Sequence, residues 1–162
     1  MTMLRKANPL RVILLLSFML VISGCTVKLI ASYDETTDKN VTSLQRKTET
    51  FLTDLEAKYG LPECSYEKNA TFYSESKVDL SAIKVRAEAI PKNDITVKQL
   101  DLLESSLNDL ESLHKLKDKK TKDKGSLECI SIDEIDPLRT AFNSSFTAIL
   151  KLELAKKRGD DE

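Results

Sequence analysis

Residues 96–117 read TVKQLDLLESSLNDLESLHKLK, and the spacing of the apolar side chains in this stretch decides the fold. Leucines recur at intervals of three and four, which places them on one face of an α-helix. The positions that follow this spacing are Leu100, Leu103, Leu107, Leu110, His114 and Lys117, with Leu113 and Leu116 beside them. Thr96 with Gln99 three residues later has the pattern of a capping box. We therefore expect a helix that begins near Thr96 and ends before Gly125.

The segment after residue 31 has the same periodicity. Ser32 followed by Glu35 is a second capping-box pattern, and Gly60 with Pro62 is a typical helix end. The apolar positions between them are Val41, Leu44, Thr48, Phe51, Leu52, Leu55 and Tyr59. This segment predicts a helix from about Ser32 to Tyr59.

Two more helices are expected. The second segment covers roughly residues 67–90 and ends at Pro91. Its first half contains weak helix formers, so a helix that begins only at Ser76 is an alternative. The fourth is expected to start with Asp136 as its cap and Pro137 in its first turn, where a missing N–H costs little. Its apolar positions are Leu138, Phe142, Phe146 and Ile149.

Four amphipathic helices with short connections predict an all-α fold, an antiparallel up-down-up-down bundle of four helices or of three long ones. The chain has only four glycines and four prolines in 162 residues, which favours long helices. An intermolecular coiled coil is the alternative. Each run covers only about three heptads, and breakers turn the chain back on itself, so we favour the monomeric bundle.

The N-terminus has the order of a secretory signal peptide. Arg5, Lys6 and Arg11 precede an apolar run over residues 12–22, and Ile22-Ser23-Gly24-Cys25 closes it. This ending resembles the lipobox of bacterial lipoproteins. An uncleaved membrane span is the alternative, but the run has 11 residues and a span needs about 20.

The resemblance implies that residues 1–24 are removed and that Cys25 becomes the first residue of the mature chain. It also implies a diacylglycerol on the Cys25 thiol and an N-acyl chain on its amino group, which attach the protein to a membrane. We expect no other cofactor and no metal. Thr26 stands where aspartate would signal retention in the inner membrane, so the resemblance implies an outer-membrane protein facing the periplasm.

These boundaries predict a short linker over residues 25–31, a helical domain over 32–157 and a polar tail over 158–162. Removing residues 1–24 takes away three basic residues and no acidic ones, which moves the formal net charge from −1 to −4. A weakly acidic, exported chain is a poor candidate for nucleic-acid binding.

Two cysteines remain in the mature chain, Cys64 after the first helix and Cys129 before the fourth. In an up-down-up-down bundle, the connections that hold them lie at the same end. An exported protein meets an oxidising compartment, so we expect a disulfide between them at the end away from the membrane. Its loop of about 65 residues would stabilise the fold by about 4 kcal/mol on the chain-entropy model.

Most candidate sites in the sequence have an ordinary structural interpretation. His114 is the only histidine and lies on or beside an apolar stripe, where packing is expected. No serine elbow, Gly-rich phosphate loop or calcium loop is present, so we expect no catalytic residue. The one concentration of charge is basic and comprises Lys115, Lys117, Lys119, Lys120, Lys122 and Lys124. It is either a solvated helix end or a contact site for an envelope protein or an anionic polymer.

We therefore expect a non-enzymatic binding or scaffolding lipoprotein of the envelope. One alternative is a carrier that holds a small apolar ligand between the helices, which a wide core with a deep pocket would favour. Another is an exclusion or immunity lipoprotein that acts against a phage, a plasmid or a toxin.

Replacing Cys25 with serine tests the anchor. Cys25→Ser removes the thiol that accepts the diacylglycerol, so a larger, unprocessed precursor should accumulate without acyl chains. Mass spectrometry of the two purified proteins measures this. An unmodified Cys25 in the wild-type protein would contradict the lipoprotein assignment.

Overall fold

The computed structural model describes residues 30–124 and 129–160, and for 119–124 the backbone alone. The predicted signal peptide, the lipobox-like sequence with Cys25 and the four residues 125–128 lie outside the described residues, as do 161–162. The described chain forms four long helices: α2 (Glu35–Ala57), α3 (Tyr66–Glu88), α4 (Asp94–Lys124) and α5 (Ile132–Asp160). A single 3-10 turn, η1 (Pro62–Cys64), lies between α2 and α3.

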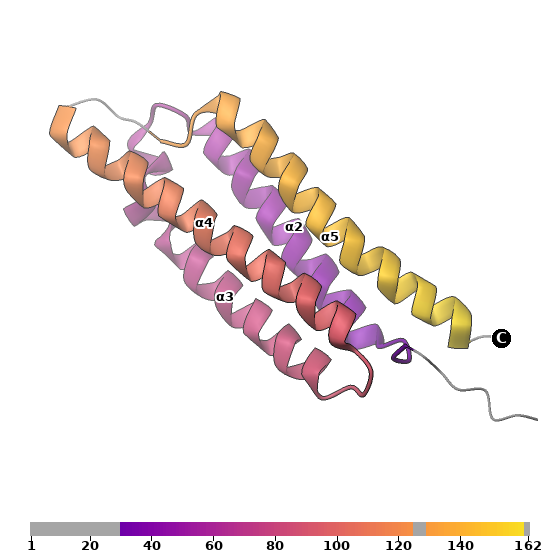
Figure 1. Cartoon of the computed structure of the whole chain (residues 1–162). Coiled ribbons are helices and arrows are strands. Elements are labelled where there is room, and N and C mark those ends of the chain that lie inside the picture. Colours follow the sequence, from indigo (N-terminus) through magenta and orange to yellow (C-terminus); the bar gives the residue numbers. More distant parts are fainter. Residues whose placement is uncertain (1–29, 125–128, 161–162) are drawn as a thin grey trace, which may run out of the picture.

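The helices form the expected antiparallel up-down-up-down bundle (Figure 1). Each helix packs against its neighbours in the chain, and α5 closes the bundle by packing against α2. The start of α2, the α3–α4 connection and the end of α5 lie at one end. The η1 connection and the start of α5 lie at the other, which we call the disulfide end.

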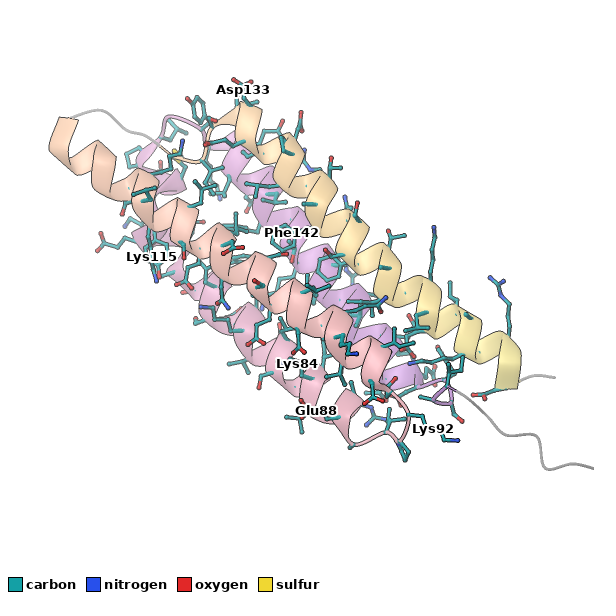
Figure 2. All side chains as sticks on the ribbon, in the orientation of Figure 1. Lys84, Glu88, Lys92, Lys115, Asp133 and Phe142 are labelled. Carbon is teal, nitrogen blue, oxygen red and sulfur yellow. A yellow bond between two sulfur atoms is a disulfide. The ribbon has the colours of Figure 1, made fainter. Side chains whose placement is uncertain are left out.

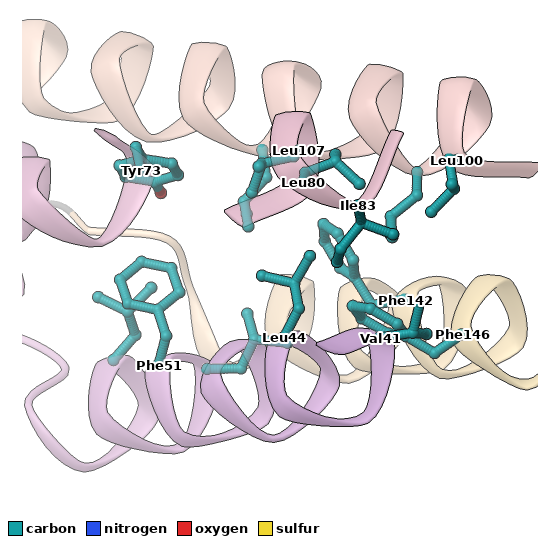
Figure 3. Packing of buried hydrophobic residues seen from close by; sticks show 14 of the residues in the cluster. Val41, Leu44, Phe51, Tyr73, Leu80, Ile83, Leu100, Leu107, Phe142 and Phe146 are labelled. Carbon is teal, nitrogen blue, oxygen red and sulfur yellow. The ribbon is translucent and has the colours of Figure 1, made fainter. Parts of the chain in front are cut away.

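The predicted apolar stripes meet in one core (Figure 3). Leu100, Leu103, Leu107 and Leu110 of α4 are at most 3% exposed. Phe142 and Phe146 of α5 are buried in the same cluster. Burial of a large apolar side chain contributes about 1.5–3 kcal/mol, so these stripes supply most of the driving force for folding.

Ion pairs between neighbouring helices surround this core. Lys84 of α3 binds Asp101 and Glu104 of α4 at 2.7 and 2.6 Å. Arg139 of α5 likewise bonds two α2 carboxylates, those of Glu49 and Glu56. Pairs of this kind favour one set of neighbours over another more than they add stability.

The predicted start of α2 is wrong by two residues. Asp34 caps the helix instead of Ser32, and its Oδ2 accepts hydrogen bonds from the backbone N–H of Thr37 at 2.9 Å and from its hydroxyl at 2.6 Å. The Arg86 guanidinium, at the end of α3, donates two further bonds of 2.6 Å to the same carboxylate. Contact with a distant helix therefore decides between the two capping residues.

α3 begins close to residue 67, the earlier of the two predicted starts, and not at Ser76. α3 begins at Tyr66 because its first turns carry aromatic side chains that pack into the bundle. The Phe72 ring stacks on Phe51 of α2 with centroids 3.7 Å apart, and Tyr73 is 1% exposed. Tertiary packing outweighs the weak helix propensity of residues 69–76.

The predicted starts of α4 and α5 are also wrong. α4 begins at Asp94, and the Thr96 hydroxyl is buried and bonded to α5 instead of capping its own helix. α5 begins at Ile132, where the Ser131 backbone N–H and hydroxyl both donate to Glu134 at 2.8 Å. Pro137 therefore lies inside α5, and the added turn brings Ile135 into the core.

The predicted disulfide is confirmed. Cys64 at the end of η1 and Cys129 before α5 are bonded, with their Cα atoms 5.8 Å apart. Both are buried, and they belong to the core cluster. The bond joins the α2–α3 connection to the segment that enters α5.

The other end of the bundle holds a buried ion pair. Lys156 and Glu153 of α5 are 3% and 0% exposed, and Lys156 Nζ lies 2.5 Å from Glu153 Oε1. The same ammonium donates to Asn93 Oδ1 at 2.6 Å and to Thr96 Oγ1 at 2.7 Å. Asn93 donates in turn to the carbonyl oxygen of Ala87. This polar cluster ties the end of α5 to the α3–α4 connection.

Lys156→Met should destabilise the fold by about 3–5 kcal/mol, because it leaves the Glu153 carboxylate buried without its cation. Replacing both groups, as Glu153→Leu with Lys156→Met, should cost less than the single change, because no buried charge remains. Urea unfolding measures both free energies, and Lys151→Met on the exposed face of α5 is the control. A double variant that loses as much stability as Lys156→Met alone, or more, would contradict the coupling.

Candidate functional site

The disulfide end is organised around His114 of α4, whose side chain is fully buried. Its Nε2 lies 2.8 Å from the carbonyl oxygen of Cys64, and its Nδ1 lies 2.8 Å from the Tyr73 hydroxyl. A carbonyl oxygen can only accept, so Nε2 carries the proton. In the neutral imidazole, Nδ1 then accepts a hydrogen bond from Tyr73.

Burial decides the ionisation of both partners. It lowers the pKa of His114 below its usual value, against the Cys64 carbonyl and Asp118, which raise it. Burial also raises the pKa of Tyr73. The pair is therefore held neutral at physiological pH, with the packing role that the sequence predicts for His114.

An aromatic cluster surrounds this pair. The rings of Tyr66 and Phe51 lie 5.8 and 6.3 Å from the imidazole, centroid to centroid. The stacked pair of Phe51 and Phe72 connects the cluster to the surface between α2 and α3. Figure 3 shows Phe51 and Tyr73 facing one another from these two helices.

Glu111 lies one turn before His114 and collects three donors. It accepts hydrogen bonds from the Tyr66 hydroxyl at 2.8 Å and from Lys77, and it pairs with Lys115 at 2.7 Å. Partial burial raises the pKa of Glu111, but the hydrogen bonds from Lys115, Lys77 and Tyr66 outweigh it and lower the pKa to about 2. Glu111 is thus a fixed anion that joins α4 to α3.

The six lysines predicted as a contact site divide into two groups. Lys115, at the disulfide end in Figure 2, pairs with Glu111 and lies 4.9 Å over the Tyr66 ring. Lys117 pairs with Glu134 of α5 at 2.7 Å. Both therefore hold neighbouring helices together. The side chains of the other four, Lys119, Lys120, Lys122 and Lys124, lie outside the described residues, although their backbone belongs to α4.

A surface groove runs along the contact between α2 and α3, in the half of the bundle nearer the disulfide. Its volume is about 550 Å³, and it is open to solvent. Arg46, Lys47 and Lys68 lie beside it, and Phe51 and Phe72 form part of its wall. This surface, the α2–α3 groove, has no signature in the sequence, because its residues come from two helices.

The buried ion pair of Glu153 and Lys156 was also missed, although the sequence contains a signal for it. Phe142, Phe146 and Ile149 define the buried stripe of α5, and residues 153 and 156 continue it at the same spacing. Charged residues on an apolar stripe are expected to pair when buried.

Neither membrane-spanning helices nor metal sites are found in the described part of the chain. None of its helices is long and apolar enough to cross a bilayer. Within residues 30–124 and 129–160, no three His, Cys, Asp or Glu side chains are placed to hold a metal ion. Comparisons with protein-family models, curated proteins and solved structures find no match for this chain.

The neutral state of His114 predicts a pH dependence of stability. Because its folded pKa is lowered, the unfolded chain binds a proton first as the pH falls below about 6.5. The stabilisation is therefore complete above that pH and is lost below it, by at most about 1.4 kcal/mol per pH unit.

His114→Gln should remove this dependence, because glutamine can still donate to the Cys64 carbonyl but does not titrate. Unfolding free energies of both proteins at pH 7.5, 6.5 and 5.5 measure the effect. His114 is the only histidine, so the comparison is free of other imidazoles. Parallel pH profiles for the two proteins would show that His114 does not contribute.

Proposed function

We propose that this chain is a non-catalytic, lipid-anchored binding module of a bacterial envelope, and that its disulfide end contacts a partner. The anchor part of the proposal comes from the lipobox resemblance at Ile22–Cys25, and the binding part comes from the shape of the bundle. The partner is an envelope protein or an anionic polymer.

The observation that carries the proposal is the length of α4. His114 lies level with the disulfide, since it bonds to the Cys64 carbonyl, and α4 continues for ten residues beyond it, to Lys124. At 1.5 Å per residue, this segment extends about 15 Å past the bridge. Figure 1 shows the end of α4 standing clear of the η1 connection and of α5. A helix that projects past the end of the bundle presents a surface to a partner, and a binding role accounts for this extension of α4.

The proposed anchor lies at the opposite end. Cys25 precedes Glu35, the first residue of α2, by ten residues, so the lipid would hold that end of the bundle near the membrane. α2 has 23 residues and spans about 35 Å, which would place the disulfide end that far from the bilayer. The lysine segment at the end of α4 would then lie about 50 Å from the bilayer.

The packing of the bundle argues against the carrier alternative. The space between the helices is filled by large side chains, among them Tyr73, Phe142 and Phe146, all at most 3% exposed. The α2–α3 groove is open to solvent and is lined by charged and hydroxyl groups as well as by two rings. Neither feature suits the sequestration of an apolar ligand.

Replacing Lys119, Lys120, Lys122 and Lys124 with glutamine tests the proposed contact. Binding to purified envelope fractions should fall severalfold, and wild-type binding should weaken with added salt, since charge attraction is screened over about 8 Å at physiological ionic strength. Thermal stability should hardly change, because the proposal assigns these four lysines to binding and not to folding.

A control with the same change in charge is Lys39, Lys98, Lys151 and Arg158 replaced together by glutamine, away from the end of α4. This control should bind envelope fractions like the wild type. Equal binding by both variants, whether reduced or unchanged, would contradict a specific contact at the lysine segment.

A further inference from the structure

The α2–α3 groove has the dimensions of a ligand site. Its volume of about 550 Å³ falls within the range of about 300–1,000 Å³ that small-molecule sites occupy. One stripe of α2 from Ser43 to Asp54 forms one side, and residues 68–75 of α3 form the other. Asp54 lies eleven positions after Ser43 on the helix, so the groove is about 16 Å long.

Its wall contains a rigid pair of aromatic rings. Phe51 and Phe72 are stacked with centroids 3.7 Å apart and an interplanar angle of 7°. Tyr73 packs edge-on against both rings, and His114 fixes Tyr73 through its hydroxyl. Phe72 is only half-buried, so part of its ring is available at the surface without any rearrangement of the core.

In the α2–α3 groove the carboxylates have ion-pair partners, whereas two of the cations do not, among the described residues. Its two carboxylates are already paired, Glu75 with Lys47 at 3.0 Å and Asp54 with Lys58 at 3.3 Å. Arg46 and Lys68 are exposed, and neither has an ion-pair partner among the described residues. Two uncompensated cations therefore flank the aromatic pair, in a chain whose net charge is negative.

Uncharged hydrogen-bonding groups complete the lining. Ser43, Thr50 and Thr71 contribute hydroxyl groups. The Asn69 amide nitrogen donates to the carbonyl oxygens of Glu63 and Ser65, at 2.9 and 2.7 Å. These two bonds fix the side chain, and its oxygen remains as a hydrogen-bond acceptor. Convergent polar groups around an apolar surface are the usual composition of a site that orients its ligand.

We propose that the α2–α3 groove binds a small anion that carries a carboxylate or phosphate group on a flat apolar ring. The guanidinium of Arg46 matches either oxyanion by paired N–H donors, and the Lys68 ammonium adds a point charge. The exposed part of Phe72 offers the ring an offset or edge-on contact. This inference goes beyond the proposed envelope role, because it requires neither the anchor nor the lysine segment.

Titration of the purified full chain with phenyl phosphate, followed by amide chemical shifts, tests the site. Shifts should concentrate on residues 43–54 and 68–75, and Arg46→Gln with Lys68→Gln should weaken binding at least tenfold. Both side chains are exposed, so the thermal stability of this variant should match the wild type. Benzoate should bind at the same residues, and its affinity relative to phenyl phosphate distinguishes a carboxylate ligand from a phosphate ligand.

Two controls make the result decisive. Lys98→Gln with Arg158→Gln removes the same charge from α4 and α5 and should leave the affinity within twofold of the wild type. Phenol, which has the ring without the strong anion, should bind at least tenfold more weakly. Shifts outside the groove, equal loss in the control variant, equal binding of phenol, or no saturation at millimolar phenyl phosphate would each overturn the proposal.

Discussion

The hydrogen bond from His114 Nε2 to the Cys64 carbonyl oxygen is the contact on which the disulfide end depends. It joins α4 to the η1 connection, and the disulfide joins that connection to the start of α5. All three segments are thereby fixed against one another. The same histidine holds Tyr73, which supports the stacked rings beside the α2–α3 groove. Both proposed binding surfaces therefore rest on one neutral, buried imidazole.

The opposite end is held by charge instead of a covalent bond. Lys156 bonds to Glu153 Oε1, Asn93 Oδ1 and Thr96 Oγ1 at once, so a single ammonium connects α5 with the α3–α4 connection. Burying an ion pair is weak evidence for added stability, because desolvation offsets most of the attraction. The geometry of this cluster is strict, however, because the Lys156 ammonium must lie within bonding distance of three partners. The cluster thus selects one register of α5 against its neighbours.

The periodicity of the sequence was sufficient to predict the helices, the bundle and the disulfide, because apolar spacing and cysteine placement are local properties. It was not sufficient to predict the helix starts. Ser32 and Asp34 are both good caps, and the bonds from the distant Arg86 to the Asp34 carboxylate cannot be read from the local sequence. Likewise, Thr96 resembles a cap until α5 occupies its hydroxyl. The α2–α3 groove could not be predicted either. Arg46 and Lys68 lie on different helices and share no pattern along the chain.

The distribution of ion-pair partners identifies binding surfaces better than the density of charge does. Three cations each bind two carboxylates of a neighbouring helix: Lys47, Lys84 and Arg139. Their charges are therefore already paired within the fold. The first lysines of the basic segment are also paired, Lys115 with Glu111 of its own helix and Lys117 with Glu134 of α5. Cations available to a ligand are those for which folding supplies no carboxylate. Such cations occur beside the aromatic pair of the α2–α3 groove, where the sequence shows no concentration of charge.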